Sequence, residues 1–514
     1  MLKKLCAVLL TLALLMSSCM AFAESGDTAV VKDFGGITLK VWKPLWWTSV
    51  VTSDSVNEVW KTLEQKFNVH FEFIQPSVGS EQEQFNLLMA GGELPDIIMT
   101  DWSGTDLYTG GLDKYVEEGV IIDLKEHAEW MPNYLHCIET YVSAEEQKEF
   151  STDSGYMTQF YAISPYEEYS CNGLLLREDW LKELGLEQPT TLDQLENILT
   201  QFKEKEGAEA PLMFPETGVD LLSGFLVSAY GIGPAFYHDG DVVKYGPAEA
   251  AFKDYLLKMA DWYKKGLIDQ DFVSRDQEGY RRMLTTSKTG AVIDSPDNVY
   301  TYMKDIAIMA GGTYPVLKEG ERVHYRYKMY QCRPPYCAAV SADCKNVEAA
   351  MTVLDYGYTE DGWMLCNYGI EGLTYNMVDG VAVFTDVILN NPEYPSLLDS
   401  FARYKWHIGP FLRFEHESDA AITQENMGTR RALTENADAD QVMPLVTLTA
   451  DEGSEYASIM NQVKTYQDSA VVNFITGKKD IETEFDAYLA DLHRLNIDRA
   501  IEIQQAALDR YNAR

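Results

Sequence analysis

The chain has 514 residues, more than one hydrophobic core usually serves, so at least two lobes are expected. Hydrophobic residues make up 46% and charged residues 24%, the proportions of an ordinary globular protein. Lys and Arg number 42 against 80 Asp and Glu, and the formal charge of −38 argues against nucleic acids and anionic membrane surfaces as partners.

The N-terminal residues have the pattern of a secretory signal. Lys3 and Lys4 precede an apolar run at residues 5–16, which is too short to cross a membrane. Two processing sites compete: cleavage of residues 1–23 after Ala23 would release the protein, whereas a lipoprotein-like box ending at Cys19 would leave it lipid-anchored. Both predict an exported, extracytoplasmic protein. No later stretch approaches the ~20 apolar residues of a membrane span.

Removal of the signal leaves six cysteines. An even number in an exported protein permits disulfides. A chain of this length does not need them for stability, so free buried thiols are the preferred interpretation. The cysteines are Cys137, Cys171, Cys332, Cys337, Cys344 and Cys366.

The first mature segment alternates between predicted strands and helices. Strands are expected at residues 37–42, 69–73 and 97–99, with amphipathic helices at 56–67 and 85–89 between them. Asp54 is predicted to cap the first helix, and Gly91-Gly92 to end the second. This order predicts a doubly wound α/β lobe with a parallel sheet.

Aromatic and acidic residues follow the first and third of these strands. Trp46 and Trp47 come after residues 37–42, and Asp101 and Trp102 come after residues 97–99. Ligands of open α/β sheets bind beyond the carboxyl ends of the strands. Rings stack on the C–H faces of sugars while carboxylates accept hydrogen bonds from hydroxyls, so a neutral oligosaccharide site is predicted at this edge. Packing in the core is the alternative for each ring.

The next part of the chain continues the α/β pattern. A helix is expected within residues 119–133 and should stop at Pro132, and a strand near 161–165 leads into a loop that contains Tyr166 and Tyr169. Further strands are predicted at 174–176 and 291–293, and further helices from 178, from 191, at 250–265 and at 348–358.

Several stretches, in order along the chain, resemble the extracellular solute-binding proteins of carbohydrate ABC transporters, particularly the large lipoprotein-type sugar-binding group. They are LMAGGELPDIIMTD at 88–101, GLLLREDWLKELGLEQPTTLDQLENILTQF at 173–202, KNVEAAMTVLDYGYTEDG at 345–362, YGIEGLTYN at 368–376 and the stretch 473–511.

The resemblance implies a two-lobed periplasmic-binding-protein fold, type II-like, with discontinuous lobes joined by hinge crossings. The first lobe is expected to comprise residues 24–165 and 326–380, and the second residues 166–325 and 381–514 with the C-terminal helices. Crossings are expected near 162–169, 314–333 and 376–383. The implied function is the substrate-binding component of an importer, which closes its hinge around an oligosaccharide and then meets membrane permease subunits.

The resemblance also suggests further ligand-binding residues. Asp297 and Tyr300 follow the strand at 291–293, where related maltose-binding proteins present a stacking aromatic. Trp406 resembles the stacking residue of the second lobe, with packing as its alternative role. The full candidate set is Trp46, Trp47, Asp101, Trp102, Tyr166, Tyr169, Asp297, Tyr300 and Trp406.

No sequence motif indicates catalysis, a cofactor or a bound metal. P-loop, HExxH, GxSxG and GxGxxG patterns are absent. Asp239-Gly240-Asp241 is predicted to be a hairpin turn, because no Glu closes a calcium-binding loop at the required spacing. We therefore expect a monomeric binding protein that is not an enzyme. The alternatives are a binding protein for peptides or another small solute, and an exported glycoside hydrolase.

Overall fold

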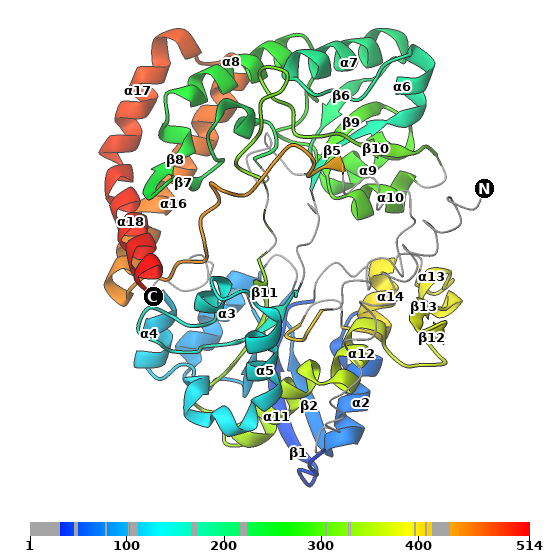
Figure 1. Cartoon of the computed structure of the whole chain (residues 1–514), viewed down its shortest axis with the longest axis vertical. Coiled ribbons are helices and arrows are strands. Elements are labelled where there is room, and N and C mark those ends of the chain that lie inside the picture. The colour runs from blue at the N-terminus through cyan, green and yellow to red at the C-terminus, as the bar shows by residue number, and fades with distance from the viewer. Residues whose placement is uncertain are drawn as a thin grey trace, which may run out of the picture.

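The protein has two lobes, each built around its own sheet (Figure 1). A computed structural model describes residues 31–45, 50–77, 80–100, 102, 111–165, 172–215, 224–303, 306–326, 328, 330–394, 397–406, 409–413 and 432–514. The predicted two-lobed α/β fold is confirmed. The predicted signal segment lies outside the described residues.

The strands and helices have the following bounds. The strands are β1 (Ile37–Trp42), β2 (Val69–Ile74), β3 (Ile97–Ile98), β4 (Phe160–Ile163), β5 (Gly173–Arg177), β6 (Ala210–Met213), β7 (Phe236–Asp239), β8 (Val242–Tyr245), β9 (Thr289–Asp294), β10 (Met309–Gly311), β11 (Cys332–Val340), β12 (Tyr375–Val378) and β13 (Val381–Phe384). The helices are α2 (Glu58–Phe67), α3 (Glu81–Gly91), α4 (Gly111–Glu117), α5 (Pro132–Tyr141), α6 (Glu178–Leu184), α7 (Leu192–Lys205), α8 (Ala251–Lys264), α9 (Gln277–Thr285), α10 (Pro296–Met303), α11 (Val347–Asp355), α12 (Glu360–Tyr368), α13 (Asp386–Leu389), α14 (Leu397–Tyr404), α16 (Ala450–Ile475), α17 (Ile481–Arg494) and α18 (Ile497–Ala513).

The first sheet has the strand order β2-β1-β3-β11-β4. β1 pairs in parallel with β2 and β3, as the alternation of strands and helices predicts. β11 is antiparallel to both β3 and β4, and it is contributed by a segment far along the chain. A second sheet has the order β10-β5-β9-β6, in which β9 is antiparallel to β5 and parallel to β6.

Two local predictions in the first lobe are wrong. Asp54 does not cap α2: the cap is Asn57, whose side chain accepts a hydrogen bond from the backbone N–H of Val59. Pro132 does not end a helix but begins α5, because a proline in the first turn loses no helical hydrogen bond. The helix expected before it is a short 3-10 helix, Leu124–Trp130.

Predictions in the second lobe agree with the structure. Thr191 caps α7 in a reciprocal pair of hydrogen bonds with Gln194. Asp239-Gly240-Asp241 forms the turn of the β7–β8 hairpin, where Gly240 has a φ of +61° that favours glycine.

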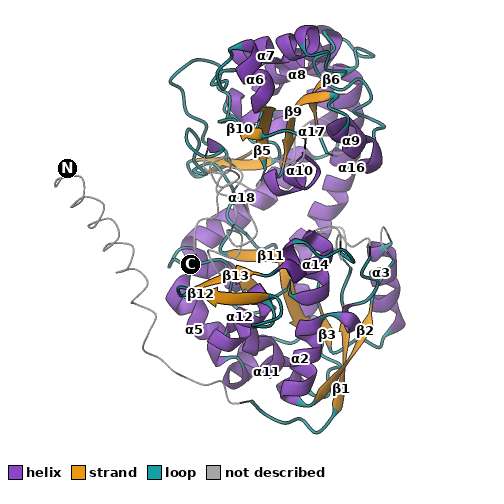
Figure 2. Cartoon of the chain, turned by 90° about the vertical axis from the view of Figure 1, so that its right-hand side faces the viewer, coloured by secondary structure: helices purple, strands orange, loops and turns teal. Residues whose placement is uncertain are grey.

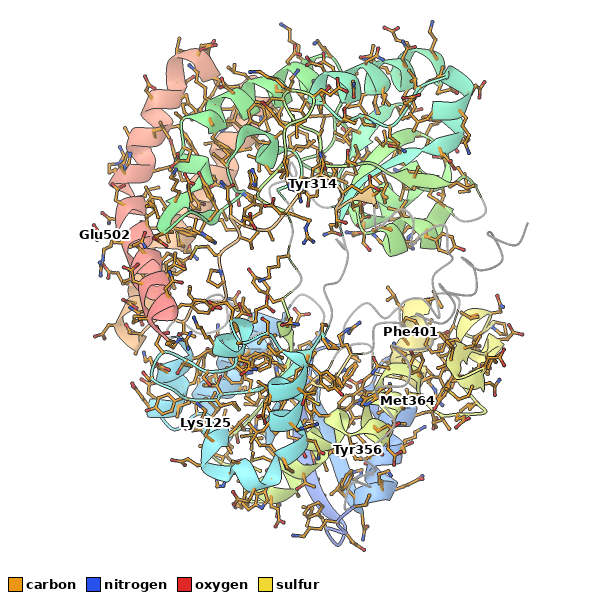
Figure 3. All side chains as sticks on the ribbon, viewed as in Figure 1. Lys125, Tyr314, Tyr356, Met364, Phe401 and Glu502 are labelled. Atoms are coloured by element: carbon orange, nitrogen blue, oxygen red, sulfur yellow. The ribbon has the colours of Figure 1, made fainter. Side chains whose placement is uncertain are left out.

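Each lobe buries a separate apolar core. The first core takes residues from 39–163, 332–366 and 406–412, and the second takes residues from 174–323 and 433–500. Figure 3 shows Tyr356 in the first lobe and Tyr314 in the second, and both rings are buried. Neither lobe is therefore a continuous piece of the chain.

The first two predicted crossings agree with the structure, and the third does not. The chain passes from β4 to β5 and later from Val323, in the second core, to β11. Residues near 376–383 form the β12–β13 hairpin instead of a crossing. The chain stays on the first core through Leu412 and joins the second core at Leu433.

Five cysteines are buried and free, which confirms the thiol prediction for them, whereas Cys171 lies outside the described residues. Burial raises the pKa of Cys137 and of Cys344 to about 12, so these thiols stay protonated at neutral pH. The five are Cys137, Cys332, Cys337, Cys344 and Cys366. Among the described residues, no helix combines the length and apolar character that membrane crossing requires.

Asn57 joins α2 to the end of α14, and its removal should destabilise the first lobe. It is 1% exposed, and its Nδ2 donates to the carbonyl oxygens of Ala402 at 2.8 Å and of Lys405 at 2.9 Å. We expect Asn57→Ala to lower the free energy of unfolding by about 1–3 kcal/mol in urea denaturation. Asn86→Ala, at an exposed position of α3, is the control and should change it by less than about 0.5 kcal/mol. Equal losses in the two variants would contradict this role.

Candidate functional site

The carboxyl ends of the parallel strands in both lobes lie at the edges where the chain crosses between lobes. β11 begins at Cys332, directly after the second crossing, and runs antiparallel to β3, so the end of β3 lies on the crossing side. β5 begins at Gly173, directly after the first crossing, and runs antiparallel to β9, so the end of β9 also lies there. The edges at which open α/β sheets bind their ligands therefore face each other across the crossings (Figure 2).

A buried polar cluster occupies this edge of the first lobe. Lys43 follows β1, Gln75 follows β2, and both contact the carboxylate of Asp54. The Lys43 Nζ lies 2.7 Å from Asp54 Oδ2, and the Gln75 Nε2 donates to the same oxygen at 2.8 Å. Lys43 and Asp54 are 8% and 5% exposed, so the ion pair is held out of water. It fixes the backbone at Lys43, the residue that follows β1.

A second polar cluster occupies the facing edge of the second lobe. Asp294, the last residue of β9, accepts hydrogen bonds from the Tyr280 hydroxyl at 2.6 Å and from Asn298 Nδ2 at 2.7 Å. Burial, together with the Asp294 carboxylate, raises the pKa of Tyr280 well above its usual value, so its hydroxyl stays a donor. Asp294 thereby anchors the first turn of α10, which carries the candidate Tyr300 as a half-buried residue.

The structure describes only part of the predicted site. Tyr300 lies on α10, three residues after Asp297, whose backbone belongs to the same helix and whose side chain is outside the described set. The other undescribed candidates are Trp46, Trp47, Asp101, Tyr166 and Tyr169. The described residues next to them, Lys43 and Thr100, lie at the crossing edge.

Two predicted stacking residues are core residues instead. Trp102 is 4% exposed and packs edge-on against Phe85 and Tyr115, at centroid distances of 5.6 and 4.8 Å. Trp406 is 3% exposed and packs against Trp60 at 4.6 Å in the core of the first lobe, not the second. Their rings have no free face for a sugar, so the prediction that they stack on ligand is wrong for this conformation.

Sequence reasoning missed the residues that hold the site in place. Lys43, Gln75 and Asp294 each stand at or next to the end of a strand that the sequence predicts, which is a signal that could have found them. The sequence predicts only a helix cap for Asp54, because the pairing of this residue with Lys43 depends on tertiary contact. The Lys43–Asp54 pair therefore emerged only from the structure.

One group of described side chains has the composition of a cation site. Ligand atoms of His324, Asp438 and Asp440 lie within 4.8 Å of one another. Arg322 already places its Nε 2.8 Å from Asp438 Oδ2, so the carboxylate has a cationic partner in the protein itself. The group lies beside the second crossing, where Val323 bridges to Ala437.

Comparisons with known proteins agree with this architecture. Residues 49–362 match the family model described as bacterial extracellular solute-binding protein. The chain is 24% identical over 508 residues to lipoprotein LipO of Bacillus subtilis, which covers 92% of both chains. It is 28% identical over 302 residues to the fructooligosaccharide ABC transporter substrate-binding protein FusA of Streptococcus pneumoniae, with 53% of this chain and 54% of FusA covered. The crystal structure of the alginate-binding protein AlgQ2 without calcium superposes with a TM-score of 0.76 at 23% identity, over 93% of this chain and all of that one.

The packing of Trp102 predicts a stability defect for its truncation. Trp102→Ala should lower the free energy of unfolding by about 3–5 kcal/mol, because a large ring is removed from a close-packed core. Trp130→Ala is the control, since Trp130 is half-buried and stacks on His127 at 4.8 Å. Denaturation followed by circular dichroism measures both. An unchanged free energy of unfolding in Trp102→Ala would contradict the assignment of this ring to the core.

Proposed function

The chain belongs to the bacterial extracellular solute-binding protein family, and on this basis we propose that it binds a neutral oligosaccharide between its lobes for an ABC importer. The observation that carries the proposal is the placement of both ligand-binding edges at the crossings. Residues that follow the strands there are proposed to contact one common ligand, while each sheet stays rigid behind them.

The relatives favour a carbohydrate as the solute. FusA is named for fructooligosaccharides and AlgQ2 for alginate. The segments outside the described residues include Trp46, Trp47, Asp101, Tyr166 and Tyr169, a combination of rings and a carboxylate suited to sugars. With Asp297 and Tyr300 on α10, they form the proposed set of ligand contacts. The net charge of −38 favours an uncharged sugar over an acidic one.

Ligand binding is proposed to close the hinge. Each lobe alone supplies only part of the proposed contacts, so the ligand binds the closed form more tightly than the open form and shifts the population toward it. The closed form then presents a joint surface of both lobes to the permease subunits. The lobes need no catalytic residue for this task, and we propose that the protein is a monomer without enzymatic activity.

The protein is proposed to act outside the cytoplasm. The family is extracellular and the relative LipO is a lipoprotein. Release after Ala23 and anchoring at Cys19 both fit the N-terminal sequence. Mass spectrometry of the mature N-terminus distinguishes them, because only the anchored form carries a lipid on Cys19.

A thermal-shift screen tests the proposed ligand class. A neutral oligosaccharide at a hundredfold excess over its dissociation constant should stabilise the folded state by ~2.7 kcal/mol and raise the melting temperature. Amino acids, nucleotides and peptides should leave it unchanged, and the glycan should gain no reducing ends during incubation. A response to peptides alone would overturn the proposed ligand, and new reducing ends would identify a hydrolase.

A matched pair of tryptophan variants tests the proposed contacts. Trp47→Ala should abolish the stabilisation by sugar, because the proposed stacking partner is lost, while the ligand-free melting temperature should stay unchanged. Trp130→Ala should keep the response to sugar, because Trp130 stacks on His127 and is not among the proposed ligand contacts. An unaltered sugar affinity of Trp47→Ala, measured by calorimetry, would remove this ring from the site.

A further inference from the structure

The C-terminal helices contact both lobes. α16 packs against α8 of the second lobe and against α4 of the first. α18 runs beside α16 and ends against the first lobe, as the left side of Figure 1 shows. The segment before α16 also returns to the first core, where Leu445 packs. These contacts are separate from the strand crossings.

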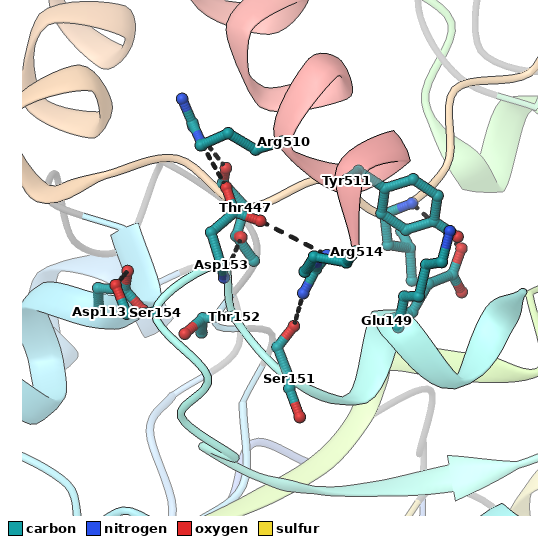
Figure 4. A network of polar contacts seen from close by, with 12 residues as sticks. Asp113, Glu149, Ser151, Thr152, Asp153, Ser154, Thr447, Arg510, Tyr511 and Arg514 are labelled. Atoms are coloured by element: carbon teal, nitrogen blue, oxygen red, sulfur yellow. Dashed lines mark hydrogen bonds and ion pairs between the residues drawn. The ribbon is translucent and has the colours of Figure 1, made fainter.

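A network of charges and hydrogen bonds fixes the end of α18 to the first lobe (Figure 4). Arg510 pairs with Asp153 of the first lobe at 2.5 Å and with Glu452 of α16 at 2.7 Å, and it donates to the carbonyl oxygen of Thr447 at 3.1 Å. Arg514 donates to the carbonyl oxygen of Ser151 at 2.7 Å.

Glu149 lies buried beneath this network. Its side chain is 6% exposed, and its Oε1 accepts a hydrogen bond from the backbone N–H of Leu445 at 3.2 Å. Its Oε2 is also buried and has no hydrogen-bond donor in the part of the chain that the structure describes. Oε1 keeps its hydrogen bond in either protonation state. A neutral carboxyl group leaves only an O–H at Oε2 without an acceptor among the described residues, whereas an ionised one would leave negative charge there without a partner, which costs far more free energy.

We propose that these residues form a pivot between the lobes, the C-terminal anchor, and that protonation of Glu149 determines how stably the anchor holds. The anchor comprises Glu149, Asp153, Leu445, Thr447, Arg510, Tyr511 and Arg514. Its contacts do not involve the solute, so the anchor is testable in the ligand-free protein. Only its consequence for lobe closure depends on the proposed function.

The charged groups around Glu149 set the direction of the effect. Burial and then the Glu146 carboxylate raise the pKa of Glu149 to about 8, while the N–H of Leu445 and the Lys328 ammonium oppose the shift. Lys328 is itself paired with Glu146 at 2.6 Å, so its positive charge is largely used there. Glu145 on the same segment adds to the increase.

Two other elements packed against Glu149 contribute groups that stay neutral. β11 contributes the Cys332 thiol, which stays protonated because burial raises its pKa well above the usual value. α18 contributes the Tyr511 ring, with Lys148 5.1 Å and Arg514 5.4 Å from its centroid. The pKa of Tyr511 is also raised, by burial and then by Glu149, so this hydroxyl stays neutral.

Two states of the anchor determine the sign of the pH dependence. In the docked state the end of α18 and the segment around Leu445 pack on Glu149, and in the undocked state they have left it. Undocking returns Glu149 to water and to its ordinary pKa near 4.5, whereas the docked value is about 8. The docked state therefore holds the proton more tightly between these values. Docking is strongest below the lower value and weakens by up to about tenfold per pH unit as the pH rises toward the upper one.

Hydrogen exchange of the ligand-free mature protein at pH 6 and pH 9 tests the anchor. After correction for intrinsic exchange rates, the protection of residues 443–449 and 508–514 should fall at least tenfold at the higher pH. Glu149→Gln should remove this dependence, because its amide is neutral at both pH values and has the shape of the carboxyl group. Arg510→Ala should lower protection at both.

Two further variants keep the test decisive. Arg499→Ala is the matched control, because Arg499 also lies on α18 but pairs with Glu455 on α16 at an exposed position, and it should behave as the parent protein. Glu146→Gln should move the midpoint to lower pH, and it replaces Glu149→Gln if that variant does not fold. Equal protection at pH 6 and pH 9 in the parent protein, or an unchanged midpoint in Glu146→Gln, would overturn the role of Glu149.

Discussion

The pairing of β11 with β3 and β4 is the constraint on which the architecture depends. β11 reaches the first sheet only after the chain has built most of the second lobe, yet it lies between two strands of the first lobe. The first sheet is incomplete without it, since β4 pairs with no other strand of that sheet. The strand that completes the first sheet is therefore also the strand that connects it to the second lobe. This fixes the crossings at the edge where the strands end.

The position of the crossings explains why the sheet edges beside them, called the rims here, are polar. It also explains why the rings of Trp102 and Trp406 are buried. A strand that ends at the rim presents backbone groups and loop residues there, and these need fixed partners to stay in place. Lys43 with Asp54 on one rim, and Asp294 with Tyr280 on the other, provide them. The aromatic rings of Trp102 and Trp406 stabilise the layer below, where no water competes for their faces.

The sequence predicted regular elements well because their signals are local. The alternation of β1 and β2 and the turn at Gly240 depend on neighbours a few residues away. The β12–β13 hairpin also has a local sequence signal, because Asp379-Gly380 stands between alternating apolar residues. Both residues have the positive φ of such a turn. The resemblance to the family instead predicted a crossing here, which is wrong.

Local sequence signals do not predict the burial of the Trp102 and Trp406 rings. Trp406 is buried because Asn57 and Trp60, more than three hundred positions earlier, pack against its segment. Side chains at the end of a strand point alternately to ligand and to core, and the sequence near Trp102 does not decide between them. The Lys43–Asp54 pair likewise depends on where two loops meet.

If the two lobes close on a ligand, the position of the C-terminal helices determines which residues at the facing sheet edges move furthest. A rotation displaces each residue in proportion to its distance from the axis. α16, α17 and α18 lie along one side of the molecule, and α10 and α14 lie on the opposite side (Figure 1). If the C-terminal anchor holds the end of α18 to Ser151 and Asp153 during the proposed closure, the rotation axis passes close to that contact. In the proposed closure, Tyr300 on α10 then travels further than the residues of the C-terminal anchor, so we propose that the approach of α10 helps to enclose the solute.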